Sequence, residues 1–121
     1  MPEKSSQIFN EETQNRINCM PATLLNDKVC GMKWVSVFPG NPINFGCNNV
    51  SAVMVLSEIE KGFPIAFMEG TMCSNLRTAS VSAVAAKYLA PSKVETIGFI
   101  GAGEQAKTHF MAMKTMFHNI K

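Results

Sequence analysis

The order of hydrophobic and polar residues divides the chain into a polar start, a β-rich middle and an α/β end. Residues 1–18 are mostly polar, which is typical of an exposed arm, and we expect an edge strand only at residues 16–20. Residues 31–38 (GMKWVSVF) are rich in valine and aromatic residues and predict a strand, on which Lys33 shares one face with two valines.

A short antiparallel meander is expected to continue from this strand. Residues 39–42 (PGNP) end it, because proline cannot donate a hydrogen bond to a neighbouring strand, and a loop extends to residue 49. Residues 50–59 (VSAVMVLSEI) predict the next strand, and residues 60–62 (EKG) predict a turn. Residues 63–69 (FPIAFME) then form the returning strand.

The remaining segment changes to a helical and then an α/β pattern. Residues 73–89 are rich in alanine and predict a helix, which Thr71 or Ser74 can cap through a side-chain oxygen. After Pro91 the chain reads as a strand at residues 94–100, a glycine turn, and a helix at 107–117.

Composition excludes several classes of protein. The chain has 121 residues, of which 46% are hydrophobic and 17% charged, and a net charge of only +2, so we expect a globular domain with no nucleic-acid partner. The apolar runs are too short for a membrane span and the polar opening is unlike a signal peptide. No C-x-x-C motif occurs, so we interpret the four cysteines as free, mostly buried thiols of a cytoplasmic protein; they are Cys19, Cys30, Cys47 and Cys73.

The best local motif is G-x-G-x-x-A, which has glycines at positions 101 and 103 and ends at Ala106. Gly101 permits a sharp turn out of the strand, Gly103 lets the backbone approach a pyrophosphate, and Ala106 allows close packing of helix and strand. The free N–H groups of the helix start would then bind the phosphates. Because the motif joins a predicted strand to a predicted helix, it favours dinucleotide binding over a purely structural turn.

Two cations are further candidates. Lys33 lies mid-strand among apolar residues, so it either faces a site or is an ordinary solvated lysine. Arg77 is expected in the first turn of its helix, where a cation opposes the helix dipole, so it either binds a carboxylate or is a surface arginine. His109 and His118 have no carboxylate at metal-ligand spacing, and we interpret them as surface or packing residues rather than metal ligands.

Taken together, these segments resemble the ornithine cyclodeaminase/mu-crystallin family over roughly residues 19–113. The order of a G-x-K strand, an L-R-T-A helix and a G-x-G-x-Q-A turn makes the resemblance specific. The matching segments are CMPA at 19–22, GMKWVSVFPGNP at 31–42, residues 49–71, LRTASVSAVAAKYLA at 76–90 and IGFIGAGEQAK at 97–107.

The resemblance implies an enzyme that uses NAD, or NADP, on amino acids or cyclic imines. In ornithine cyclodeaminase, NAD⁺ takes a hydride from the α-carbon of ornithine, the terminal amine attacks the imine, ammonia leaves, and the hydride returns to give proline. Other members are 2,3-diaminopropionate biosynthesis dehydrogenases and imine or ketimine reductases. A non-catalytic remnant or a small-molecule-binding protein is the alternative from another class.

The resemblance also implies roles for individual residues. Lys33 matches a lysine that contacts substrate at the reacting centre, and Arg77 matches an arginine that grips the substrate carboxylate beside the nicotinamide. Lys4 matches a basic substrate-binding residue that is usually arginine. Asn49 stands where the family has a cofactor-contacting threonine. The pyrophosphate turn is matched by Gly101, Gly103, Glu104 and Gln105.

The expected fold is therefore α/β, with a β-rich substrate-binding and dimerisation domain followed by the first strand and helix of a truncated Rossmann domain. We assign residues 1–90 to the first, partial domain and residues 91–121 to the second. A full-length member is expected to be a homodimer. The 121 residues alone are expected to be inactive and prone to aggregation, because part of their apolar surface faces segments outside this sequence.

Overall fold

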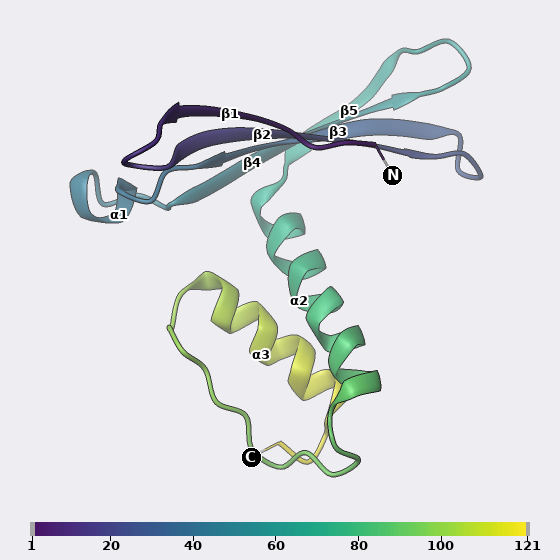
Figure 1. The fold of residues 1–121 in the computed structure, drawn as a ribbon. Helices are drawn as coiled ribbons and strands as arrows, with labels where there is room; N and C mark the ends of the chain where they lie inside the picture. Colours follow the sequence, from purple (N-terminus) through teal and green to yellow (C-terminus); the bar gives the residue numbers. More distant parts are fainter. Residues whose placement is uncertain (1, 121) are drawn as a thin grey trace. The chain divides into compact units, whose positions relative to one another are not determined.

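A computed structural model describes residues 2–120, and the chain divides after Thr71 into two compact units. The first unit is a five-stranded antiparallel sheet in the order β1-β2-β3-β4-β5, and α2 and α3 belong to the second (Figure 1). The elements are β1 (Ser5–Asn10), β2 (Asn15–Leu24), β3 (Val29–Val37), α1 (Asn41–Asn44), β4 (Val50–Glu58), β5 (Pro64–Glu69), α2 (Thr71–Leu89) and α3 (Glu104–Met116).

The segment expected to be a polar arm forms a β-hairpin: the strand expected at residues 16–20 is confirmed within β2, but β1 was not predicted. β1 pairs with β2 along its length, although all of its residues are exposed. The turn is fixed locally, because the side-chain oxygen of Asn10 accepts the N–H groups of Glu12 at 2.8 Å and Thr13 at 3.0 Å. Gln14 completes the turn with a φ of 57°. Backbone pairing and this turn form the hairpin without hydrophobic alternation.

The predicted meander is confirmed in β3, β4 and β5, whose ends lie within about two residues of the expected positions. The loop between β3 and β4 contains the short helix α1, which the sequence did not indicate. The turn between β4 and β5 is organised by the Glu58 carboxylate, which accepts N–H groups of Glu60, Lys61 and Phe63. These hydrogen bonds, the one from Lys61 foremost, lower the pKa of Glu58.

Strand register assigns the residues of the sheet to two faces. Asn18, Val35 and Ala52 are directly opposed on β2, β3 and β4, and all three are buried. Asn18 is polar but satisfied, because its side-chain oxygen accepts the hydroxyl of Ser6 at 2.7 Å. Lys33, two residues before Val35, shares this face.

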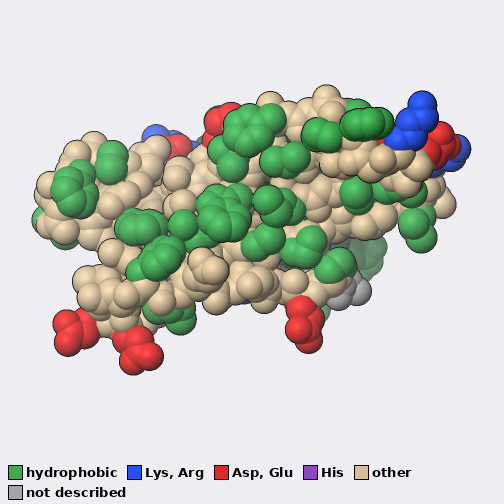
Figure 2. Space-filling model, turned by 90° about the horizontal axis from the view of Figure 1, so that it is seen from above, with side chains coloured by type: hydrophobic (Ala, Val, Ile, Leu, Met, Phe, Trp, Pro, Cys, Tyr) green, Lys and Arg blue, Asp and Glu red, His purple; other side chains and the backbone are tan. Residues whose placement is uncertain are grey.

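The opposite face of the sheet carries apolar side chains that remain accessible. Trp34 is 37% exposed and stands opposite Val53, while Met32, also 37% exposed, stands opposite Val55. Phe67 extends the Met32 row onto β5 and is 74% exposed. Figure 2 shows hydrophobic side chains gathered over a broad face of the sheet.

The second unit contains the two long helices. α2 begins at Thr71, earlier than expected, and the Thr71 hydroxyl oxygen accepts the Ala52 N–H at 2.9 Å. α3 begins at Glu104 after the N-cap Gly103. The strand expected at residues 94–100 is not formed, because no strand among residues 2–120 lies beside it to complete its hydrogen bonds.

The cysteines are free, as expected, but they are not mostly buried. Cys19 and Cys30 are half-buried on β2 and β3, and the Cys19 sulfur lies 3.4 Å from the Met32 sulfur. Cys47 and Cys73 are exposed. Within the described part of the chain, no helix is both long enough and apolar enough to cross a membrane.

Candidate functional site

Lys33 lies at the middle of the sheet in a row of methionines. The register places it opposite Met20 on β2 and Met54 on β4, and Met54 in turn opposes Met68 on β5. All four residues are half-buried. Directly opposed side chains in an antiparallel sheet share a face and contact one another, so the lysine stem lies between thioether side chains. The residues directly opposite Lys33 on both neighbouring strands are therefore apolar.

The chain segment that enters α2 is held against this row. Gly70 donates its N–H to the Ala52 carbonyl at 2.8 Å, and it has little room for a side chain. A Cβ at this position would lie 3.0 Å from Cγ of Met54 and 3.2 Å from the carbonyl carbon of Val53. The glycine therefore permits a close approach of the backbone at residue 70 to Met54 and Val53 of β4.

The other candidates in the first unit are not brought next to Lys33 by the sheet. Lys4 is exposed and immediately precedes β1. Asn49 is exposed and lies one residue beyond the last pair of the β3–β4 ladder, Val37 with Val50, where its carbonyl accepts the Phe38 N–H at 2.9 Å. The Asn49 side chain is thus at the end of the ladder, whereas Lys33 occupies its centre.

Arg77 lies on α2 and is exposed. Because the helix begins at Thr71, Arg77 is in the second turn, one turn deeper than expected, and its unfavourable interaction with the helix dipole is correspondingly weaker. An exposed guanidinium on a helix presents two parallel N–H groups, which match the geometry of a carboxylate.

The glycine turn leads into α3 with an open helix start. Gly101 adopts a φ of 97°, in the left-handed region that favours glycine, and a Cβ on Gly103 would meet no atom within 4 Å. The first bonds within the helix run from the N–H groups of Ala106 and Lys107 to the Gly103 carbonyl, and no side chain caps Gly103. The preceding N–H groups, those of Glu104 and Gln105, therefore remain available to an anion.

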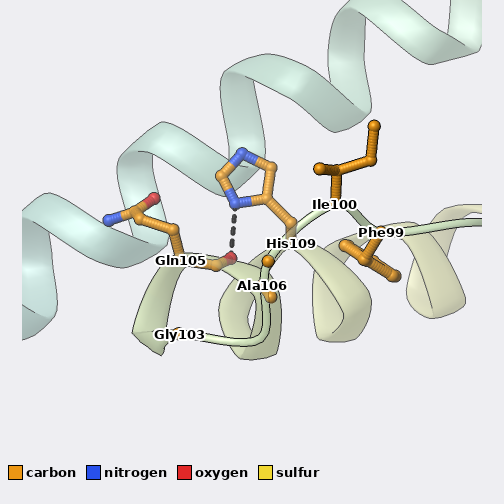
Figure 3. A pocket seen from close by; sticks show the side chains of 7 residues that line it. Phe99, Ile100, Gly103, Gln105, Ala106 and His109 are labelled. Atoms are coloured by element: carbon orange, nitrogen blue, oxygen red, sulfur yellow. Dashed lines mark hydrogen bonds between the residues drawn. The ribbon is translucent and has the colours of Figure 1, made fainter.

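A hollow of about 300 Å³ lies over this turn (Figure 3). It is lined by Phe99, Ile100, Gly101, Gly103, Gln105, Ala106 and His109. The one acidic side chain in the first turn, Glu104, forms an ion pair with Lys107 at 2.5 Å, which offsets its charge near the helix start. The turn therefore fits a pyrophosphate group.

The sequence did not reveal a polar network between α2 and α3. Gln105 donates its side-chain N–H to the Asn75 side-chain oxygen at 2.5 Å, and the Ser82 hydroxyl lies 3.0 Å from Nε2 of His109. His109 Nδ1 lies 2.7 Å from the Gln105 carbonyl oxygen, as the dashed line in Figure 3 marks. The spacing of Gln105 and His109, four residues apart on one helix face, is the signal that could have indicated this network.

Sequence comparison agrees with the motifs. The profile of the ornithine cyclodeaminase/mu-crystallin family matches residues 1–121. Alanine dehydrogenase of Archaeoglobus fulgidus is 39% identical over 117 residues, which are 97% of this chain and 34% of the relative. Delta(1)-pyrroline-2-carboxylate reductase of Bacillus cereus is 37% identical over 88% of this chain and 32% of its own. Ornithine cyclodeaminase of Brucella abortus is 33% identical over 94% of this chain and 31% of its own length.

Solved structures give the same result. Delta(1)-pyrroline-2-carboxylate reductase of Thermococcus litoralis, in complex with NADH and L-proline, matches with a TM-score of 0.91 and 35% identity, over 99% of this chain and 36% of that one. An archaeal alanine dehydrogenase dimer with bound NAD matches with a TM-score of 0.85 and 39% identity, over 98% of this chain and 35% of the dehydrogenase chain. The chain spans about a third of the length of the curated relatives it matches. The chain belongs to the ornithine cyclodeaminase/mu-crystallin family.

Proposed function

We propose that the full-length gene product is an NAD-dependent enzyme that acts at the α-carbon of a small amino acid or cyclic imine. The observation that carries this proposal is the uncapped start of α3 after the left-handed Gly101, which fits a pyrophosphate. NADH in the Thermococcus reductase and NAD in the archaeal dehydrogenase support the same cofactor here. When bound, NAD supplies a hydride acceptor and donor for the α-carbon.

The residues of this chain have distinct roles in the proposal. Arg77 binds the substrate carboxylate through two parallel hydrogen bonds and so fixes the α-carbon in position. Lys33 contacts the substrate nitrogen at the reacting centre and donates or accepts its proton. Gly101, Gly103, Glu104 and Gln105 bind the pyrophosphate through the turn and the helix start, and Lys4 and Asn49 add substrate and cofactor contacts.

The first candidate reaction is the conversion of L-ornithine to L-proline and ammonia. It is supported by the match to the Brucella ornithine cyclodeaminase over 94% of this chain. In this reaction the substrate is oxidised to an imine, its δ-amino nitrogen bonds to the imine carbon, ammonia leaves, and the ring imine is reduced. The cofactor ends in its starting oxidation state. Lys33 is placed in the proposal to transfer protons in the oxidation and reduction steps.

Reduction of a cyclic imine such as Δ1-pyrroline-2-carboxylate is the second candidate. The methionine row on both sides of Lys33 favours it, because thioether side chains suit an apolar ring better than the terminal ammonium of ornithine. The Bacillus and Thermococcus relatives bear the name of this activity. A 2,3-diaminopropionate biosynthesis dehydrogenase is a further alternative within the family.

The proposed organisation of the enzyme follows the same reasoning. Residues 1–90 would form part of a substrate-binding and dimerisation domain, and residues 91–121 the start of the Rossmann domain. The apolar sheet face around Trp34 would pack against a second copy of the chain, as befits a relative of a dimeric dehydrogenase. Four free cysteines support a cytoplasmic location, where thiols stay reduced.

Parallel assays of the full-length gene product test the proposal. Ornithine with NAD⁺ is followed by ammonia and proline, and Δ1-pyrroline-2-carboxylate with NADH is followed by loss of absorbance of the reduced cofactor. Turnover in the first assay supports the cyclodeaminase and turnover only in the second supports the reductase. A protein that binds NADH but turns over neither substrate, nor alanine, would instead be a non-catalytic binding protein.

A further inference from the structure

The two helices of the second unit carry different parts of the proposed site. Arg77, on α2, is assigned to the substrate carboxylate, and the first turn of α3 is assigned to the cofactor. Asn75 lies two residues before Arg77, and its side chain accepts the hydrogen bond from Gln105 at 2.5 Å. One hydrogen bond therefore connects the carboxylate-binding helix to the cofactor-binding turn.

The hydrogen bond between Asn75 and Gln105 is shielded from water and held in place from both sides. Asn75 is only 8% exposed, so water does not readily replace Gln105 as the partner of its side-chain oxygen. Gln105 is held from its other side, because its carbonyl oxygen accepts the Nδ1 proton of His109 at 2.7 Å. The Ser82 hydroxyl lies 3.0 Å from Nε2 of His109, which connects the helices a second time. In Figure 3 the side chains of Gln105 and His109 both extend toward the neighbouring helix.

We infer that Asn75 is a positioning residue that makes binding of the substrate carboxylate and of the cofactor cooperative. The inference rests on the proposed function. A ligand on the helix start of α3 orders the first turn, including Gln105, and through Asn75 it orders the segment of α2 that bears Arg77. A carboxylate bound to Arg77 acts in the reverse direction. By thermodynamic linkage, each ligand raises the affinity of the protein for the other by the same factor. Without the bond, each ligand keeps its own contacts but no longer orders the other site.

Variants of Asn75 separate this role from simple packing. Asn75→Leu keeps the branched shape and the number of side-chain heavy atoms and removes the acceptor, whereas Asn75→Asp keeps an oxygen that can accept the Gln105 N–H. Ser80→Ala is the matched control, because Ser80 lies on the same helix and donates only to the Leu76 carbonyl at 2.8 Å on the exposed side. Circular dichroism of each variant checks that the helices are intact.

The measurement is the Kd of NADH in the full-length gene product, by fluorescence, without and with saturating L-proline. We expect proline to tighten NADH binding at least about fivefold in the unaltered protein and in Ser80→Ala. Asn75→Leu should reduce this factor to near one while the Kd of NADH alone changes by less than about threefold, and Asn75→Asp should restore most of it. Retention of the full factor in Asn75→Leu, or its equal loss in Asn75→Asp, would overturn the inference.

The same titration separates the inference from the function on which it rests. If the unaltered protein binds NADH but proline leaves its Kd unchanged, the coupling is refuted and the proposed cofactor stands. If the unaltered protein does not bind NADH, the proposed function and the inference both fail.

Discussion

Lys33 and Met54 stand directly opposite each other across the β3–β4 ladder, and Met20 occupies the matching position on β2. The lysine is therefore held between flexible, polarisable side chains. Lys33 is thus suited to a proton transfer to a ligand nitrogen, and the methionines to contact with the carbon skeleton.

Replacing Lys33 with methionine should abolish most turnover without loss of cofactor binding. The new side chain resembles its neighbours, so the sheet should be preserved while the proton donor disappears. We expect kcat to fall about 10²–10⁴-fold, the usual contribution of a general acid or base. Stopped-flow or steady-state kinetics and an NADH titration of the full-length gene product measure the two effects. Lys28→Met is the control, since the Lys28 side chain lies on the surface in an ion pair with Glu60. Equal losses in both variants would contradict the assigned role.

Replacing Met54 with alanine should change substrate selection more than catalysis. The substitution removes apolar contacts beside Lys33 and enlarges the space next to Gly70. We expect KM for the preferred substrate to rise by about tenfold, equivalent to about 1.4 kcal/mol, with a smaller change in kcat. Met111→Ala, on the exposed side of α3, should leave both constants unchanged. A fall in kcat with an unchanged KM would contradict a role for Met54 in substrate binding.

Introducing a charge at Trp34 should disrupt the proposed dimer. Trp34→Glu places a carboxylate in the apolar sheet face shared with Met32 and Phe67, where burial against a second copy would leave it without a partner. We expect the full-length gene product to shift from dimer to monomer in analytical ultracentrifugation. Tyr88→Glu adds the same charge at an exposed aromatic residue on α2 and should leave the dimer intact. A dimer that persists in Trp34→Glu would place the interface elsewhere.

The β4–β5 turn should respond to pH through Glu58. Hydrogen bonds from backbone N–H groups lower the pKa of its carboxyl, so the stabilisation is present above the unfolded pKa and is lost as pH falls through the lower, folded pKa. Amide hydrogen exchange at Lys61 should therefore be protected at neutral pH, and Glu58→Gln should remove much of that protection. The two proteins should converge in acid. Glu95→Gln, an exposed carboxylate elsewhere, should behave as the unaltered protein.

Local patterns predicted those parts of the fold that local interactions stabilise. The meander was readable because β3, β4 and β5 alternate or concentrate apolar residues between clear turn signals. β1 was missed because its residues are polar and exposed, and only pairing with β2 and the Asn10 turn form it. Residues 94–100 read as a strand from their apolar character, but a strand also requires a neighbour for its hydrogen bonds.

In the candidate site, too, the sequence indicated residues in distinctive local motifs but not contacts between separate elements. Lys33, Arg77 and the glycine turn could be named because each lies in a distinctive local sequence. The methionine row depends on the register of four strands, and the Asn75–Gln105 bond joins two helices, so neither is visible in any single segment. Residues that position others across elements are the ones that sequence patterns reveal least.

The central claim, a site for NAD-dependent chemistry at an α-carbon, is tested most directly by ornithine labelled with deuterium at that carbon. The full-length gene product is incubated with labelled ornithine and NAD⁺, and the products are analysed by mass spectrometry. Our account predicts proline that retains deuterium at the α-carbon, one ammonia per proline, and no net change in NAD⁺. Failure to convert ornithine, together with failure to oxidise NADH with Δ1-pyrroline-2-carboxylate, would contradict it.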